Sequence, residues 1–316
     1  MNRLKSGILL WTGIVGLLSA AYFGFSAIVL SAALTPRPAP HAIRSPLDDD
    51  AEAVRFASAR DGVPLAGWLM PSHGTRAIVL VHGVDSASWD GGHPDLARAY
   101  VSAGFHVLAF DLRGHGRSGG KRLGLGWDER GDVRAAVDLL LARGFKPGAI
   151  GVHGTSYGAA TALLAAADIP EVGAVVADSA FSDVRDLMTA QIESRTSAPT
   201  WLASTLASPG IESIAWVFHG LDLDRIQPMR AVPAIAPRPI LFIHGNDDDV
   251  IPVRHAYRLK AASRNPADRI WVLRGRGHTE GIRLGHEQQT PSPLREMYLA
   301  KVVAFFDSAL NSNENE

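Results

Sequence analysis

Short apolar runs alternate with amphipathic stretches along most of this chain, and this alternation limits the fold more than any other feature. The run AIVLV at 77–81 is apolar at every position, as expected of a strand buried on both faces of a parallel sheet. The stretch 127–143 instead carries apolar residues at helical spacing. The pattern predicts strands at 54–59, 65–70, 77–81, 106–110, 149–153, 174–177, 239–243 and 269–273, and helices at 94–103, 127–143, 159–167, 253–263 and 294–310.

This order of elements predicts an α/β fold with an eight-stranded, mostly parallel sheet and helices on both faces. Residues 60–63 (RDGV) have the composition of a hairpin turn, so the sheet should begin with an antiparallel pair. The interval 182–237 holds no predicted strand and contains the apolar segment TWLASTLASPGIESIAWVFHG. We expect it to form a helical cap inserted over the C-terminal edge of the sheet, where such folds bind ligands.

The N-terminal segment has the character of a membrane anchor. Residues 7–34 are free of charge, and a helix of that length reaches about 40 Å, enough to cross a hydrocarbon core of about 30 Å with tilt. A cleavable signal has a shorter apolar region of about 7–15 residues, although Ser31-Ala32-Ala33 leaves cleavage open. We predict an anchor at 1–36, a proline-rich linker at 37–52 and a folded domain at 53–316 with the cap inserted in it.

Positive charges on the two sides of this segment differ little. Arg3 and Lys5 precede it, whereas Arg37 and Arg44 follow it. Because the amino terminus adds to the first group, the balance slightly favours an N-terminus inside and a folded domain on the extracytoplasmic side.

Composition excludes several classes of function. Net charge is −1 with Lys and Arg scattered along the chain, so a nucleic-acid partner is not expected. The chain has no cysteine, which removes disulfides, thiolate metal sites and a cysteine nucleophile. No histidine pair has the i, i+4 spacing of a helical zinc site, and we expect neither metal nor cofactor. The oligomeric state is left open by the sequence.

The pentapeptide Gly154-Thr155-Ser156-Tyr157-Gly158 lies between a predicted strand and a predicted helix. A tight strand-to-helix turn holds its serine in a strained conformation with the hydroxyl exposed, and the glycines avoid collisions with neighbouring backbone. Ser156 is therefore our candidate nucleophile. The backbone N–H of Tyr157 is a candidate donor to the oxyanion of a tetrahedral intermediate.

A serine hydroxyl needs a base and an orienting acid to act as a nucleophile. The loop after strand 269–273 supplies His278, with His286 as a second choice. The loop after strand 239–243 supplies Asp247, Asp248 and Asp249. Both loops follow strand C-terminal ends, at the edge where Ser156 is expected. Asp178, which follows strand 174–177, is a further candidate for the acid.

Three motifs resemble the α/β-hydrolase superfamily, in particular its serine aminopeptidase-like and monoacylglycerol-lipase-like branch, over about residues 53–310. They are HGNDDDVIP at 244–252, HGV at 82–84 and DLRGHGRS at 111–118. The resemblance implies an α/β-hydrolase fold, Asp248 as the acid and the Val84 amide as a second oxyanion donor. It also implies that loop 111–118 supports the active-site floor, although Gly114 to Gly119 match a dinucleotide-binding pattern.

Other histidines are better explained by structure. His82 and His244 lie in His-Gly turns, where an imidazole commonly bonds loop backbone, and His153 is expected in the core.

The predicted function is hydrolysis of an ester, acyl or lipid-like, by a Ser-His-Asp acyl-enzyme route. The partners expected are a small acyl substrate and a membrane. A serine peptidase is the alternative, because acidic residues in the cap could hold a substrate amine: Glu193, Glu212, Asp222 and Asp224. A non-catalytic binding protein on this fold is a third hypothesis, which the complete set of motifs disfavours.

Overall fold

The computed structural model describes residues 2–36, 51–196, 208–283 and 292–311. Contacts within the chain define two compact units, which we call the helical unit and the sheet unit. The helical unit comprises Met1–Thr35 and Arg185–Arg225, and the sheet unit comprises Pro36–Val184 and Ile226–Glu316. All five predicted site residues belong to the sheet unit: Val84, Ser156, Tyr157, Asp248 and His278.

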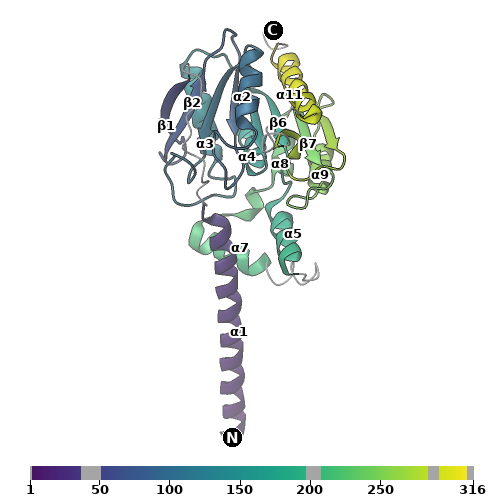
Figure 1. The fold of residues 1–316 in the computed structure, drawn as a ribbon. Coiled ribbons are helices and arrows are strands. Elements are labelled where there is room, and N and C mark those ends of the chain that lie inside the picture. The colour runs from purple at the N-terminus through teal and green to yellow at the C-terminus, as the bar shows by residue number, and fades with distance from the viewer. Residues whose placement is uncertain (1, 37–50, 197–207, 284–291, 312–316) are drawn as a thin grey trace. The chain divides into compact units, whose positions relative to one another are not determined.

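An eight-stranded sheet forms the centre of the sheet unit and confirms the predicted fold class (Figure 1). Its order is β1-β2-β4-β3-β5-β6-β7-β8. The strands are β1 (Glu52–Ala57), β2 (Pro64–Met70), β3 (Ala77–Val81), β4 (His106–Asp111), β5 (Ile150–Thr155), β6 (Val172–Asp178), β7 (Ile240–Gly245) and β8 (Arg269–Leu273). The pairs β1–β2 and β2–β4 are antiparallel, and the remaining neighbours are parallel. Strands β3 to β8 therefore all end at one edge of the sheet.

The predicted hairpin joins β1 and β2. Ala57 pairs with Pro64, and the Ser58 N–H donates to the Val63 carbonyl at 2.8 Å. Gly62 adopts a φ of 72°, which a residue without a Cβ adopts at little cost. β1 lies two residues earlier than the predicted strand 54–59, because Ser58 and Ala59 already belong to the turn connection.

Helices cover both faces of the sheet (Figure 1). Val79 and Val81 point into one core, shared with α3 (Arg130–Ala142), α4 (Tyr157–Asp168) and α9 (Arg254–Ala262). Ile78 and Leu80 point into the other core, shared with α2 (His93–Ser102) and α11 (Pro293–Asn311). The shorter helices of this unit are α8 (Pro228–Ala231), η3 (Val232–Ala234) and α10 (Glu280–Arg283). Because both faces are filled with apolar side chains, polar groups concentrate at the strand ends.

Two boundaries differ from prediction in a way that affects the site. β5 continues to Thr155, and α4 begins at Tyr157 rather than at Ala159. The turn between strand and helix therefore consists of Ser156 alone.

The helical unit contains α1 (Asn2–Leu34), α5 (Val184–Thr196), α7 (Ser208–His219) and η2 (Leu223–Arg225). Between β6 and β7, the residues that the structure describes form helices and turns and no strand. The predicted linker lies outside the described residues for 37–50, and the predicted cap does so for 197–207. In α1, residues Gly7–Leu34 are long and apolar enough to cross a membrane.

Helices α1 and α7 pack against each other within this unit. The Gly210 N–H donates to the Tyr22 hydroxyl at 2.7 Å. A Cβ at Gly210 would collide with the Ser26 hydroxyl and the Tyr22 ring. The two helices are therefore in close contact at this point.

Candidate active site

Ser156 occupies the strained turn that its sequence context predicts. Its φ is 55° and its ψ is −120°, a conformation that L-residues rarely adopt. Its N–H donates to the Asp178 carbonyl at 2.7 Å, while its own carbonyl accepts from Ala159 and Ala160 at the start of α4. These bonds fix the backbone on both sides of the hydroxyl.

The two glycines of the pentapeptide are required by close contacts. A Cβ at Gly154 would collide with the backbone of Gly158 and Ala159. A Cβ at Gly158 would collide with the carbonyls of Val81 and His82, at the end of β3. The tight packing of β5, α4 and β3 around Ser156 leaves no room for side chains at either position.

Three loops bring Ser156, His278 and Asp248 together. His278 Nε2 lies 2.8 Å from Ser156 Oγ, and His278 Nδ1 lies 2.7 Å from Asp248 Oδ2. The loops follow β5, β7 and β8, which end at the same edge of the sheet. If Nδ1–H donates to the carboxylate, Nε2 is left to accept the serine proton.

Asp248 is held as a carboxylate. Its Oδ1 accepts from the N–H groups of Val250 and Ile251 at 3.0 and 2.7 Å. Burial alone would raise the pKa of Asp248, but hydrogen bonds from His244 and His278 lower this pKa well below its ordinary value. His244 Nε2 lies 3.3 Å from Asp248 Oδ2 and also contacts the Ile251 carbonyl at 2.6 Å.

The other acid candidates are placed differently. Asp247 and Asp249 are exposed, and within the described residues neither bonds the start of helix α9, whose N-cap residue Val253 has no side-chain hydrogen bond. Asp178 is buried and accepts from the Tyr298 hydroxyl at 2.7 Å and from Ser179 at 3.0 Å. Burial raises the pKa of Asp178 above its ordinary value.

The alternative base, His286, lies outside the described residues.

The segments that carry the two predicted oxyanion donors, Tyr157 and Val84, both adjoin Ser156. Tyr157 is the first residue of α4, so its N–H has no intrahelical acceptor and lies at the positive end of the helix dipole. On the other side, a Cβ on Gly83 would stand 3.3 Å from Ser156 Cβ. Loop 82–84 therefore lies directly against the nucleophile, and Val84 is the residue that follows this contact.

His82 fixes this loop through the backbone bonds that its His-Gly turn predicts. Its Nε2 accepts from the Leu112 N–H at 2.9 Å, so Nδ1–H donates to the Gly83 carbonyl at 2.7 Å. Burial, with His115 nearby, lowers the pKa of His82 well below its ordinary value. The neutral ring therefore ties the candidate oxyanion loop to loop 111–118. His153 is buried, as predicted, and bonds Tyr100 and Tyr298.

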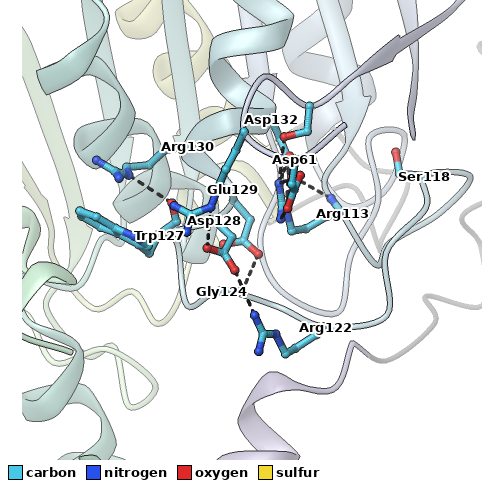
Figure 2. Close-up of polar contacts among 12 residues, drawn as sticks. Asp61, Arg113, Ser118, Arg122, Gly124, Trp127, Asp128, Glu129, Arg130 and Asp132 are labelled. Carbon is cyan, nitrogen blue, oxygen red and sulfur yellow. Dashed lines mark hydrogen bonds and ion pairs between the residues drawn. The ribbon is translucent and has the colours of Figure 1, made fainter. Parts of the chain in front are cut away.

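Loop 111–118 makes contacts that fit a structural role. The Asp111 carboxylate accepts from the N–H groups of Ser88 and Arg117 at 2.8 and 2.9 Å. A Cβ on Gly116 would collide with that carboxylate. Arg113 is buried and forms ion pairs with Asp132 at 2.7 Å and Asp61 at 2.8 Å (Figure 2). Gly116 thus makes room for a carboxylate of the protein itself.

Glu129 is a buried group that the sequence analysis missed. Its Oε1 accepts from the Gly124 N–H at 2.8 Å, and its Oε2 accepts from the Gly126 N–H at 2.9 Å (Figure 2). The Gly126 N–H also donates to the Tyr157 hydroxyl at 2.8 Å. Burial raises the pKa of Glu129 to about 7. The only signal in the sequence was the glycine-rich stretch before it, because a glutamate at a helix start normally faces solvent.

Among the described residues, no cluster of three or more His, Asp or Glu side chains has the arrangement of a metal site.

An eight-stranded, mostly parallel sheet that holds Ser156, His278 and Asp248 in one hydrogen-bonded series is typical of α/β hydrolases. Comparison with known proteins gives the same family. A model described as the alpha/beta hydrolase family matches residues 78–291, more than half of the chain. The chain therefore belongs to the alpha/beta hydrolase family.

Two relatives match most of this chain. YqkD of Bacillus subtilis (strain 168) is 31% identical over 256 residues, which cover 80% of this chain and 78% of YqkD. YfhR of Escherichia coli (strain K12) is 26% identical over 268 residues, which cover 83% of this chain and 82% of YfhR. Both carry the name "uncharacterized protein", so they support the family and add no activity. The particular branch that the motifs resemble stays a prediction.

Among solved structures, the Pyrococcus furiosus esterase Pf2001 matches with a TM-score of 0.67 and 24% sequence identity. The match covers 88% of this chain and 98% of that chain. At this identity the likeness establishes the fold.

Proposed function

We propose that this chain is a serine hydrolase that cleaves a carboxylic ester through an acyl-enzyme. One observation carries the proposal: the hydrogen-bonded series from Ser156 Oγ through the His278 ring to Asp248, at 2.8 and 2.7 Å. A half-buried serine hydroxyl on a strained turn, with a base and a buried carboxylate aligned behind it, is suited to attack a carbonyl carbon.

The steps follow from this geometry. Ser156 Oγ attacks the ester carbonyl while His278 Nε2 takes its proton, and the Asp248 carboxylate stabilises the imidazolium. The amides of Tyr157 and Val84 donate to the oxyanion of the tetrahedral intermediate. The intermediate collapses as His278 returns the proton to the leaving alcohol. A water molecule then attacks the acyl carbon while His278 Nε2 takes its proton. His278 returns this proton to Ser156 Oγ as the acyl–Oγ bond breaks and the acid leaves.

Labelling by a fluorophosphonate probe tests the proposal. The full chain should label at one serine, and Ser156→Ala should abolish labelling while leaving the thermal unfolding midpoint close to that of the wild type. A wild-type chain that does not label would refute the serine hydrolase proposal.

Three of the four acids considered for a substrate amine are engaged in ion pairs. Arg185 pairs with Glu212 at 2.6 Å and with Asp224 at 2.8 Å, and Arg225 pairs with Asp222 at 3.2 Å. The fourth, Glu193, has a buried Oε1 without a hydrogen-bond partner among the described residues, so it is the acid that a peptidase would use. We propose the ester because its cleavage by Ser156, His278 and Asp248 needs no carboxylate in the helical unit. Faster turnover of an aminoacyl anilide than of the matched ester would contradict this choice.

The proposed substrate carries an acyl chain or another apolar group, because the predicted cap and the N-terminal helix are both apolar. Rates over a series of p-nitrophenyl esters test this. Catalytic efficiency should rise with chain length, and a profile that peaks at acetate would contradict it.

We also propose that α1 is a retained membrane span with the sheet unit on the extracytoplasmic side, as the balance of flanking charges favours. The cysteine-free chain allows a direct test. A cysteine introduced at exposed Lys146 should react in intact cells with a reagent that does not cross membranes. Reaction only after lysis would reverse the orientation.

A further inference from the structure

The last turn of α7 is apolar and exposed. Trp216, Val217 and Phe218 are consecutive and are 70%, 61% and 71% exposed. At about 100° per residue they cover more than half of the circumference of the helix. Ile211 and Ala215, one helical turn apart on the same side of α7, are instead buried. Contiguous apolar surface of this kind marks an interaction site on proteins in water.

The position of α7 along α1 indicates that this exposed apolar turn contacts a lipid bilayer. The apolar stretch of α1 runs from Gly7 to Leu34, but Ser26, Leu30 and Leu34 are buried within the protein. The part before this burial, from Gly7 to Ser26, has 20 residues and forms a helix of about 30 Å, which matches the thickness of a hydrocarbon core. Tyr22 and Ser26, near the end of that stretch, are the residues that contact Gly210 in α7. α7 is therefore attached to α1 at the level where a span starting at Gly7 leaves the hydrocarbon.

Side-chain chemistry fits the boundary between headgroups and acyl chains. Tryptophan and phenylalanine are favoured at this boundary, and buried apolar area drives such binding. The nearby acids Glu212 and Asp224 are paired with Arg185, so this surface carries no excess of positive charge. Its binding should depend on apolar insertion rather than on anionic lipid.

We propose that the C-terminal turn of α7 inserts Trp216, Val217 and Phe218 into the bilayer surface, so that the helical unit rests on the membrane. The proposal depends on α1 being a membrane span. It assigns α7 a second membrane contact, which would place the predicted cap where a substrate dissolved in lipid is found.

Single-cysteine labelling tests the depth of α7. Three variants of the full chain carry an environment-sensitive fluorophore: Val217→Cys, Leu17→Cys in the middle of the proposed span, and Lys146→Cys in the sheet unit as a matched control. Each is placed in vesicles of phosphatidylcholine without nitroxide lipid, with a lipid that carries a nitroxide quencher high on its acyl chain, and with one that carries it near the end of the chain, so that both the boundary and the middle of the bilayer are sampled. Positions 17 and 217 should show blue-shifted emission and quenching by nitroxide lipid, and position 146 should show neither.

The outcomes separate the two proposals. Quenching at 17 with water-like emission at 217 overturns the α7 proposal and leaves the span intact. A blue shift at 217 without quenching means that a protein surface covers the turn, which also overturns it. No quenching at 17 refutes the span and the α7 proposal together.

A functional variant adds a second readout. Trp216→Ser/Phe218→Ser should lower the rate on an ester dissolved in vesicles several-fold more than the rate on a water-soluble short-chain ester. Equal rates of wild type and variant on the vesicle substrate would contradict insertion, whereas inactivity of the wild type on both esters would count against the proposed hydrolase instead.

Discussion

Replacing Glu129 by glutamine should remove a pH dependence of stability that the buried carboxyl creates. Glu129 is fully buried, and burial raises its pKa from the ordinary 4.5 to about 7. Between these two values the folded chain holds a proton at Glu129 that the unfolded chain has released. The free energy of unfolding therefore falls as pH rises through this window.

The size of the effect follows from the two pKa values. The interval from 4.5 to about 7, at about 1.36 kcal/mol for each pH unit, corresponds to about 3 kcal/mol. The contribution is fully present below pH 4.5, declines as pH rises, and is lost above pH 7. A glutamine has no charge to bury at any pH. It can accept from only one of the Gly124 and Gly126 amides at a time, which costs about 1–2 kcal/mol at every pH.

Urea unfolding of the full chain in detergent, followed by tryptophan fluorescence from pH 4.5 to pH 8, measures this. The stability of Glu129→Gln relative to the wild type should rise by about 3 kcal/mol across the range. Glu296→Gln, at an exposed position of α11, is the matched control and should show a constant difference. A constant difference for Glu129→Gln as well would refute the reasoning that the Glu129 carboxyl is protonated in the folded chain below pH 7.

Three further predictions concern the site and its support. Asp248→Asn should lower kcat for ester hydrolysis by a factor of about 10³–10⁴ with little change in KM, because the wrong imidazole tautomer is favoured. Asp178→Asn should lower kcat far less. If steady-state kinetics gave the reverse order, the acid would be Asp178. Gly158→Ala should lower the free energy of unfolding by about 3 kcal/mol or more and abolish fluorophosphonate labelling, because the new Cβ collides with the Val81 and His82 carbonyls. A variant that is stable and still labelled would contradict this close contact between α4 and the end of β3. Arg113→Met should cost about 3–5 kcal/mol in urea unfolding because it leaves Asp132 buried without its cation, and a cost below about 1 kcal/mol would show that the pair contributes little.

The sequence predicted those parts of the structure that depend on local pattern. Apolar runs such as 77–81 identified buried strands, and the pentapeptide around Ser156 identified the turn, because strand, glycine and helix signals are adjacent there. The order of the strands across the sheet could not be read in this way, since it depends on packing between segments far apart in the chain. Helix α4 was placed two residues late because Gly158 is a poor helix former on its own propensity.

Candidates for the acid show what the sequence leaves open. Asp247, Asp248 and Asp249 are indistinguishable by composition, and only the resemblance of 244–252 to a family pattern favoured the middle one. The structure separates them by burial and bonding, because Asp248 alone of the three turns inward to bond the Val250 and Ile251 amides. Which of three adjacent aspartates turns inward depends on the conformation of the turn, and the spacing of apolar residues in the sequence carries no information about it.

The groups that the sequence missed are those that hold the strained turn. The Ser156 N–H bonds the carbonyl of Asp178, whose carboxyl is fixed by Tyr298 and Ser179. On the other side of Ser156, the Tyr157 ring is anchored at Gly126, whose N–H is shared with Glu129. A positive φ at a serine persists only where its surroundings enforce it. Glu129 and Asp178, two buried acids with raised pKa values, therefore belong to the hydrogen-bonded support of this turn and not to the reacting residues.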